Sequence, residues 1–180
     1  MQELFNILNT TKNTLDYYYE IHKKENFNNK RNTPKDYLEW IDKKTKIIIN
    51  SPKFLEKSKE YIVRGDVIWV EFGFNIGEEF SGRHPAVVLK NGGKTLLVIP
   101  ITSKKPTEKQ ISSNNYIELG KIYNFKEMKR WINIFNITPI SIERIDFSKR
   151  KGNIKWTDLD NISKAFLSSD LFKYKPAKKI

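Results

Sequence analysis

The chain has 180 residues, no cysteine, and 33 lysines and arginines against 21 acidic residues, which gives a net charge of +12. The length suits one domain, or one small domain with an extension, and the absence of cysteine excludes disulfides, thiolate catalysis and cysteine-ligated zinc. No apolar run approaches the ~20 residues that span a bilayer, and the N-terminus lacks the features of a signal peptide, so we expect a cytoplasmic protein without membrane contact.

Residues 1–60 carry the signals of helices. Thr33 predicts the N-cap of a second helix that begins with a proline, and Ser51 with Pro52 repeats this signature and predicts a third, shorter helix. A polar stretch separates the first two helices. The apolar residues that recur at helical spacing in the first helix are Leu4, Ile7, Leu8, Leu15, Tyr18 and Ile21. We interpret residues 1–60 as a helical N-terminal extension.

From residue 61 onward the pattern changes to short strands separated by turn signals. Asn91-Gly92 predicts a tight hairpin, and Thr157 predicts the N-cap of a closing helix, with Asp160 three residues later. Strands are expected at 67–72, 85–90, 95–101, 116–119 and 131–137; residues 121–130 stay open, and 141–145 form either a helical turn or a strand end. Residues 61–180 are therefore predicted to form a small, SH3-like, partly open β-barrel with a C-terminal helix, in an α+β fold.

Four short motifs follow one another between Arg64 and Ser103. They are Gly65-Asp66-Val67-Ile68-Trp69-Val70, Gly77-x-Glu79, Gly82-Arg83-His84-Pro85-Ala86-Val87-Val88-Leu89 and Pro100-Ile101-Thr102-Ser103. In this order they resemble the MazF/PemK family of toxin endoribonucleases. Weaker similarity extends the resemblance over about residues 61–172, and residues 1–60 lie outside it.

The resemblance implies a compact barrel that forms a homodimer and cuts single-stranded RNA, such as mRNA, at short sequences without a metal or other cofactor. It implies products with a 2′,3′-cyclic phosphate and a 5′-hydroxyl. It also implies a bacterial, plasmid-encoded or phage-encoded protein and an antitoxin partner whose disordered tail folds into the RNA groove.

The order of two site residues departs from the family pattern. Family members usually have a catalytic arginine directly before the proline of the second strand, where this chain has His84, with Arg83 before it. Neighbouring side chains of a strand point to opposite faces. The exchange is therefore expected to direct His84 into the site and Arg83 away from it, unless the loop changes register. Thr102 matches the family's catalytic threonine directly.

Metal-free RNA cleavage needs a base for the 2′-hydroxyl, donors for the phosphorane and an acid for the 5′-oxygen. Arg83 can clamp phosphate oxygens, and His84 can act as base or acid. Glu79 can act as base or hold the cations in place, and Thr102 or Ser103 can donate a hydrogen bond to the phosphorane. Each residue also has a non-catalytic interpretation. Arg83 can pair with the acids of the loop, and His84 can be a structural histidine. Glu79 can be a solvated loop residue, and Thr102 an ordinary hydroxyl at the end of a strand.

Binding of RNA is assigned to aromatic and cationic side chains near this site. Phe74 and Phe80 lie in the long loop and can stack on unpaired bases, and Ser103 adjoins the catalytic threonine. Lys104, Lys105 and Lys109 follow it and can hold the RNA backbone, with a solvated charge run as the alternative. Residues 1–60 account for only +3 of the net charge, so the phosphate-attracting charge lies mainly on the predicted barrel.

Two other functions fit the same predicted barrel. One is a gyrase poison similar to CcdB, which binds a protein instead of cutting RNA. The other is an RNA-binding module that has lost catalysis through the Arg–His exchange. The role of residues 1–60 stays open: they can pack on the barrel, extend a dimer, bind an antitoxin or replace one.

Overall fold

A computed structural model describes residues 1–25, 33–57 and 61–169. The polar stretch expected to separate the first two helices, residues 26–32, lies outside the described residues. The chain divides into two compact units, Met1–Lys46 and Ile47–Ile180. The predicted boundary at residue 60 between an extension and a barrel domain stays a prediction.

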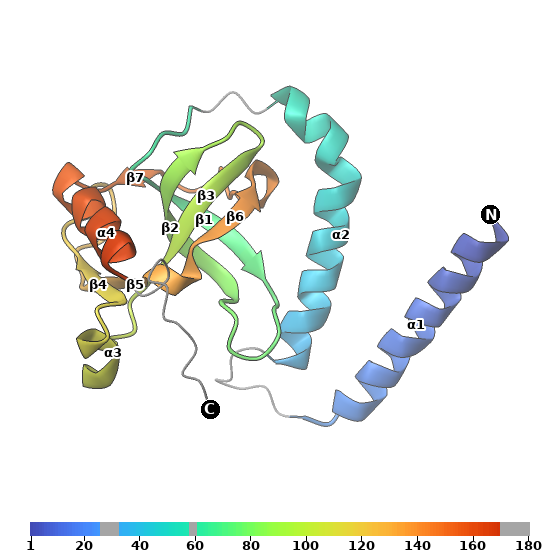
Figure 1. The fold of residues 1–180 in the computed structure, drawn as a ribbon. Helices are drawn as coiled ribbons and strands as arrows, with labels where there is room; N and C mark the ends of the chain where they lie inside the picture. Colours follow the sequence, from blue (N-terminus) through green and yellow to red (C-terminus); the bar gives the residue numbers. More distant parts are fainter. Residues whose placement is uncertain (26–32, 58–60, 170–180) are drawn as a thin grey trace, which may run out of the picture. The chain divides into compact units, whose positions relative to one another are not determined.

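The N-terminal region contains two long helices, α1 (Gln2–His22) and α2 (Pro34–Lys57) (Figure 1). The start of α2 has the predicted cap: the Thr33 hydroxyl accepts a hydrogen bond from the Asp36 amide at 3.2 Å, and the Asp36 carboxylate accepts from the Thr33 amide at 2.8 Å. The third helix predicted at Ser51 is wrong, because α2 continues through Pro52. The Ser51 hydroxyl donates to the Glu143 carboxylate at 2.8 Å and does not act as a cap.

The second unit contains a curled antiparallel sheet with short helices between its strands. Its strands are β1 (Asp66–Gly73), β2 (Gly82–Asn91), β3 (Thr95–Thr102), β4 (Tyr116–Leu119), β5 (Arg130–Asn133), β6 (Thr138–Ser141) and β7 (Gly152–Asn153). Besides residues 47–57 of α2, it contains the helices α3 (Glu108–Ser112), η1 (Ile134–Asn136), η2 (Ile142–Arg144) and α4 (Trp156–Ser168). Figure 1 shows α4 beside β4 and β5.

The sheet has the order β4-β5-β3-β2-β1-β7, and β6 also pairs with β3. One edge of β3 is shared, because Thr95–Val98 pair with β6 whereas Ile101 and Thr102 pair with β5. An isolated bridge between Val70 and Ile145 brings the chain that follows η2 back against β1. The strands β1, β2, β3 and β6 therefore curl into a partly open barrel.

Alternate residues of the strands face two different cores, as the period of a strand requires. Val67 and Val87 pack with Leu159 of α4 in the core outside the barrel. Ile68 and Val88 belong to the core that the barrel encloses. The predicted α+β fold, with N-terminal helices, a partly open barrel and a C-terminal helix, is confirmed.

Several boundaries differ from the predictions. The strand predicted at 131–137 ends at Asn133, because the Asn133 side chain accepts a hydrogen bond from the Phe135 amide at 3.0 Å and so begins η1. The N-cap predicted at Thr157 is wrong: α4 starts at Trp156 and Lys155 precedes it without a side-chain cap. The strands β6 and β7 and the helix α3 were absent from the sequence-based expectation. The segment 141–145 contains the helical turn η2.

Gly152 of β7 lies where no larger residue fits. A β-carbon there would come within 2.6 Å of both the Tyr123 carbonyl oxygen and the Phe125 ring. We expect Gly152→Ala to lower the free energy of unfolding by about 2–3 kcal/mol, because backbone and ring must both move. Chemical denaturation would measure it, with Gly77→Ala as control: that site is open, and only its positive φ of 58° opposes alanine, at about 1 kcal/mol. Equal losses in the two variants would contradict this packing.

Candidate functional site

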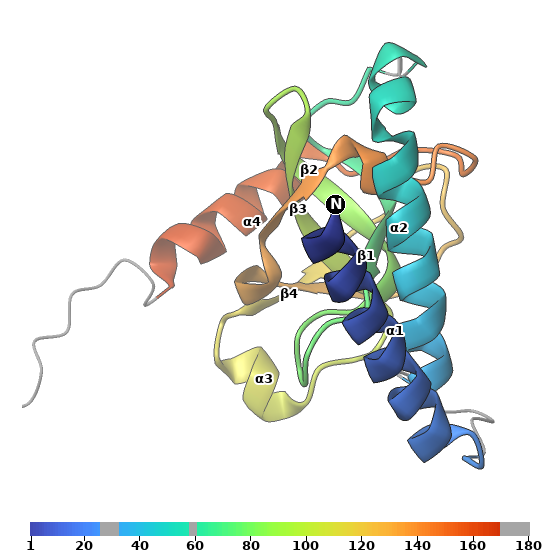
Figure 2. The same cartoon turned by 90° about the vertical axis from the view of Figure 1, so that its right-hand side faces the viewer.

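The loop between β1 and β2 is held in shape by the side chain of Asn75. Its amide nitrogen donates to the Phe80 carbonyl oxygen at 2.8 Å and to that of Phe72 at 3.4 Å, and its backbone amide donates to the Ser81 hydroxyl at 3.1 Å. The Glu79 carboxylate accepts from the Ile76 amide at 3.3 Å. The loop therefore carries Glu79 and Phe80 on a defined backbone. Figures 1 and 2 show that it leaves the barrel at the same end as α3.

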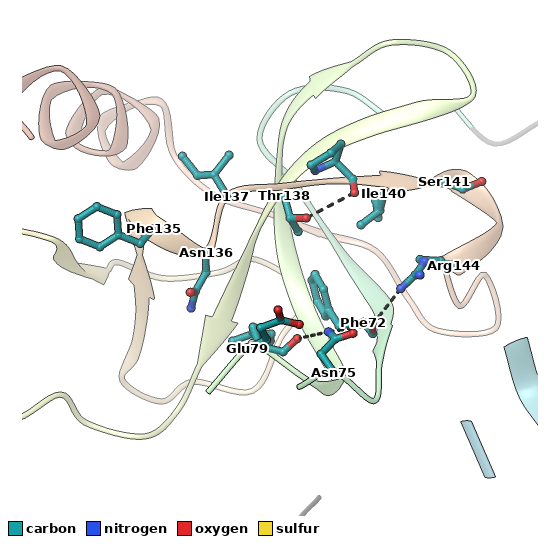
Figure 3. A pocket seen from close by; sticks show the side chains of 12 residues that line it. Phe72, Asn75, Glu79, Phe135, Asn136, Ile137, Thr138, Ile140, Ser141 and Arg144 are labelled. Atoms are coloured by element: carbon teal, nitrogen blue, oxygen red, sulfur yellow. Dashed lines mark hydrogen bonds between the residues drawn. The ribbon is translucent and has the colours of Figure 1, made fainter. Parts of the chain in front are cut away.

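A cavity of about 610 Å³ opens beside this loop. It lies between the loop, the end of β1, η1, β6 and η2 (Figure 3). Its lining residues are Phe72, Asn75, Glu79, Phe80, Phe135, Asn136, Ile137, Thr138, Pro139, Ile140, Ser141 and Arg144. Of the residues expected to act on RNA, Glu79 and Phe80 line the cavity, and the others lie outside its lining.

Arg83 is engaged by two carboxylates. Its guanidinium forms an ion pair with Asp146, its Nε lies 3.5 Å from the Glu71 carboxylate, and its guanidinium carbon lies 5.5 Å from the centre of the Trp69 ring. The hydrogen bond from the Ser148 hydroxyl, helped by the charge of Arg83, holds the pKa of Asp146 below its ordinary value. In this conformation Arg83 joins β1 and β2 to the segment after η2.

His84 lies on the other face of β2. Its ring packs against the Phe80 ring at 4.6 Å between centroids, and Phe80 in turn contacts Phe72 of the barrel core at 5.2 Å. Arg83 and His84 thus point to opposite faces, as expected for neighbours in a strand. Through the contact with Phe80, His84 lies on the side of the sheet where the cavity opens.

Thr102 ends β3, the strand next to β2. The last paired residues of the two strands are Ala86 and Pro100, and continuing this antiparallel register by two residues brings Thr102 opposite His84. His84 is two residues from Ala86 on β2, and Thr102 is four residues from Val98 on β3. By strand alternation, their side chains therefore point to the same face as Ala86 and Val98, which belong to the barrel core. Thr102 is half-buried, and its hydroxyl accepts a hydrogen bond from the Lys104 amide at 3.1 Å. The register therefore places His84 and Thr102 on the same face of the sheet.

The remaining predicted RNA-binding residues are mostly open to solvent. Phe74 is half-buried in the β1–β2 loop, whereas Ser103, Lys104 and Lys105 are exposed after β3. Lys109 is exposed on α3, whose Thr107 and Gln110 form a reciprocal capping box. The capping box is the sequence signal that would have predicted this short helix. Whether these side chains contact RNA stays a prediction.

Two of the cavity-lining residues that the sequence did not predict, Arg144 and Phe135, have side chains suited to binding RNA. Arg144 of η2 donates through Nη1 to the carbonyl oxygens of Phe72 at 2.9 Å and Glu71 at 3.3 Å, and burial lowers the pKa of its guanidinium. Phe135 of η1 is 54% exposed and lines the cavity at the opposite end from Arg144 (Figure 3). No local sequence motif predicts the role of Arg144. For Phe135, the signal was Asn133, whose side chain can cap a helical turn and so end the strand before Phe135.

Within residues 1–25, 33–57 and 61–169, no group of three or more histidine, aspartate or glutamate side chains could hold a metal ion. Over the same ranges, no helix is both long enough and apolar enough to cross a bilayer.

Comparison with known proteins places the barrel in a family. A profile described as "PemK-like, MazF-like toxin of type II toxin-antitoxin system" matches residues 63–169. The chain belongs to this PemK/MazF-like toxin family, as its motifs predicted. No curated protein sequence matches the chain.

Two solved structures are among those similar to this chain. "Endoribonuclease from Mycobacterial species" is 11% identical, with a TM-score of 0.45, over 64% of this chain and 97% of that chain. MazF from Deinococcus radiodurans is 16% identical, with a TM-score of 0.46, over 59% of this chain and 94% of that chain. The family assignment rests on the profile match, which begins after both N-terminal helices.

Proposed function

We propose that this protein is a metal-independent endoribonuclease toxin that cleaves single-stranded RNA by attack of a 2′-hydroxyl on the adjacent phosphate. The match of residues 63–169 to a toxin family carries this proposal. The barrel supports it with a histidine, a threonine and a loop carboxylate on the side where an open cavity lies.

The proposed reaction divides its proton transfers between His84 and Glu79. One of these groups takes the proton of the 2′-hydroxyl as its oxygen bonds to phosphorus, and the other protonates the 5′-oxygen as the P–O bond breaks. Thr102 donates a hydrogen bond to a phosphorane oxygen. A polar group of this kind assists most when it is held in place before the substrate arrives, and the end of a paired strand provides that rigidity.

Arg83 has two possible states in this proposal. With its guanidinium between Glu71 and Asp146, it fixes the strand that presents His84. The role predicted for it from the sequence, a bidentate clamp on a phosphate, requires the guanidinium to leave at least one carboxylate. Arg144 is the arginine that lines the cavity itself, and we propose that it attracts the RNA backbone there.

The RNA is proposed to run across the cavity toward α3. Phe80 and the exposed Phe135 offer rings on which unpaired bases can stack, and Phe74 lies in the same loop as Phe80. Ser103, Lys104, Lys105 and Lys109 lie exposed in the connection after β3, where they can contact phosphates. As a toxin of a toxin–antitoxin system, the chain is proposed to act as a homodimer and to be neutralised by an antitoxin protein.

The proposal predicts cleavage of a long single-stranded RNA by the purified protein in excess EDTA. Because side chains supply the proton transfers, chelation is expected to leave the rate unchanged, and a fully paired RNA of the same sequence is expected to stay intact. Denaturing gels over a time course would measure both. Absence of cutting over a broad set of sequences would contradict the enzymatic proposal, and gyrase-dependent DNA breakage without RNA loss would favour a protein-binding poison.

A further inference from the structure

The helix α1 presents an unusually broad apolar surface. Its side chains Leu4, Phe5, Ile7 and Leu8 are 73%, 57%, 56% and 47% exposed, and no residue of the helix is buried. At 3.6 residues per turn, the apolar positions from Ile7 through Leu4 and Leu8 to Phe5 cover roughly 160° of the circumference. Because most of the stability of a helix in a protein comes from packing of its apolar face, this surface calls for a neighbour.

The first part of α2, residues 34–46, belongs to the same unit as α1 and contacts α1 near its C-terminal end. Tyr18 of α1 packs against Tyr37 of α2 at 4.8 Å between ring centroids and against His22 at 4.6 Å. A groove of about 260 Å³ lies next to this contact, lined from both helices. Toward its N-terminus, α1 keeps its four large apolar side chains exposed. The apolar surface of α1 is wider than the stripe that one neighbouring helix covers. The surface therefore has room for a second helix.

We propose that this second helix is α2 of another copy of the same chain. Ile48 and Ile49 of α2 are 62% and 68% exposed, so α2 also has apolar surface to cover. The charges are complementary: α1 has three acidic residues and one lysine, whereas the segment 43–54 of α2 has four lysines, of which Lys46 pairs with Asp42, and no acidic residue. An acidic α1 disfavours RNA as its occupant. A second copy supplies both faces in one symmetric, isologous contact.

The natural chain has no cysteine, which makes a cross-linking test specific. Full-length Leu8→Cys and full-length Ile48→Cys, distinguishable by a mass tag, are co-expressed and treated with a short bis-maleimide. Each chain has a single thiol, so a product joining the two different chains forms only between copies. We expect this mixed product to be a major species. The matched control replaces Leu8→Cys by Asn6→Cys, on the polar face of α1, and is expected to give little of it.

A second arm tests whether the apolar surface makes the contact. Adding Leu4→Lys to the Leu8→Cys chain is expected to lower the mixed product by at least about tenfold, since a positive charge would be buried at the interface opposite the lysines of α2. Equal yields from the Leu8 and Asn6 positions, or no mixed product, would overturn the inference. A chain carrying both thiols that links only within itself would show that α1 closes on its own α2, which also contradicts it. The readout is independent of RNA cleavage.

Discussion

Replacement of Thr102 by alanine is expected to lower the rate of RNA cleavage by about 10²–10³-fold, the usual cost of removing one donor to a developing anion. The hydroxyl lies at the end of a paired strand and is half-buried. Its one hydrogen bond with the Lys104 amide is on the surface, so the fold should tolerate its loss. Single-turnover cleavage and thermal unfolding, measured on the same preparation, would separate the two effects.

Two matched variants sharpen the Thr102 experiment. Thr102→Ser keeps a hydroxyl at the same position and is expected to retain most of the rate. Ser103→Ala removes the neighbouring exposed hydroxyl, and we expect a much smaller loss than for Thr102→Ala. Full activity of Thr102→Ala would remove this residue from the proposed reaction. A large fall in its unfolding temperature would mean that the hydroxyl is structural.

Replacement of Arg83 and of His84 by alanine should have different consequences. His84→Ala is expected to lower cleavage by about 10²–10⁴-fold, the range for a proton-transfer group, with a modest effect on stability from the lost contact with Phe80. Arg83→Ala leaves Glu71 and Asp146 without their shared cation. Its main expected effect is therefore a lower unfolding temperature.

The comparison needs a rate measured well below the unfolding temperature of both variants. Arg83→Lys serves as the control, because it keeps the charge but loses the fork that reaches two carboxylates. If Arg83→Ala lost cleavage as fully as His84→Ala while remaining folded, the clamp predicted from the sequence would hold, and Arg83 would have to leave its ion pairs in the complex. Equal full activity of both variants would remove the proposed site.

The sequence predicted the barrel well where strands alternate regularly. Val67 and Ile68 face different cores because neighbouring strand residues always do, and this rule also separated Arg83 from His84. It predicted less where a single side chain ends an element. Asn133 turns a strand into η1, and Ser51 bonds to Glu143 where its pairing with Pro52 suggested a cap. Such outcomes depend on partners distant in the chain.

The candidate site shows the same division. The motifs made His84, Thr102 and Glu79 candidates because the family pattern is local in sequence. They did not identify Arg144, which reaches the cavity only because the chain after β6 returns to β1 through the bridge of Val70 with Ile145. Nor did they indicate that Arg83 would meet Asp146, which is 63 residues away. Long-range pairing of this kind is determined by the closure of the barrel.

The central claim is that a ribose hydroxyl attacks the adjacent phosphate beside His84 and Thr102, on the side of the sheet where the cavity opens. A short RNA containing one mapped cleavage position can be compared with the same strand carrying a 2′-deoxynucleotide at that position, in EDTA, with analysis of the fragment ends. We predict that the all-RNA strand gives a 2′,3′-cyclic phosphate and a 5′-hydroxyl and that the deoxy strand stays intact at that site. Cutting of the deoxy strand at an equal rate, or fragments with 5′-phosphates, would contradict the account.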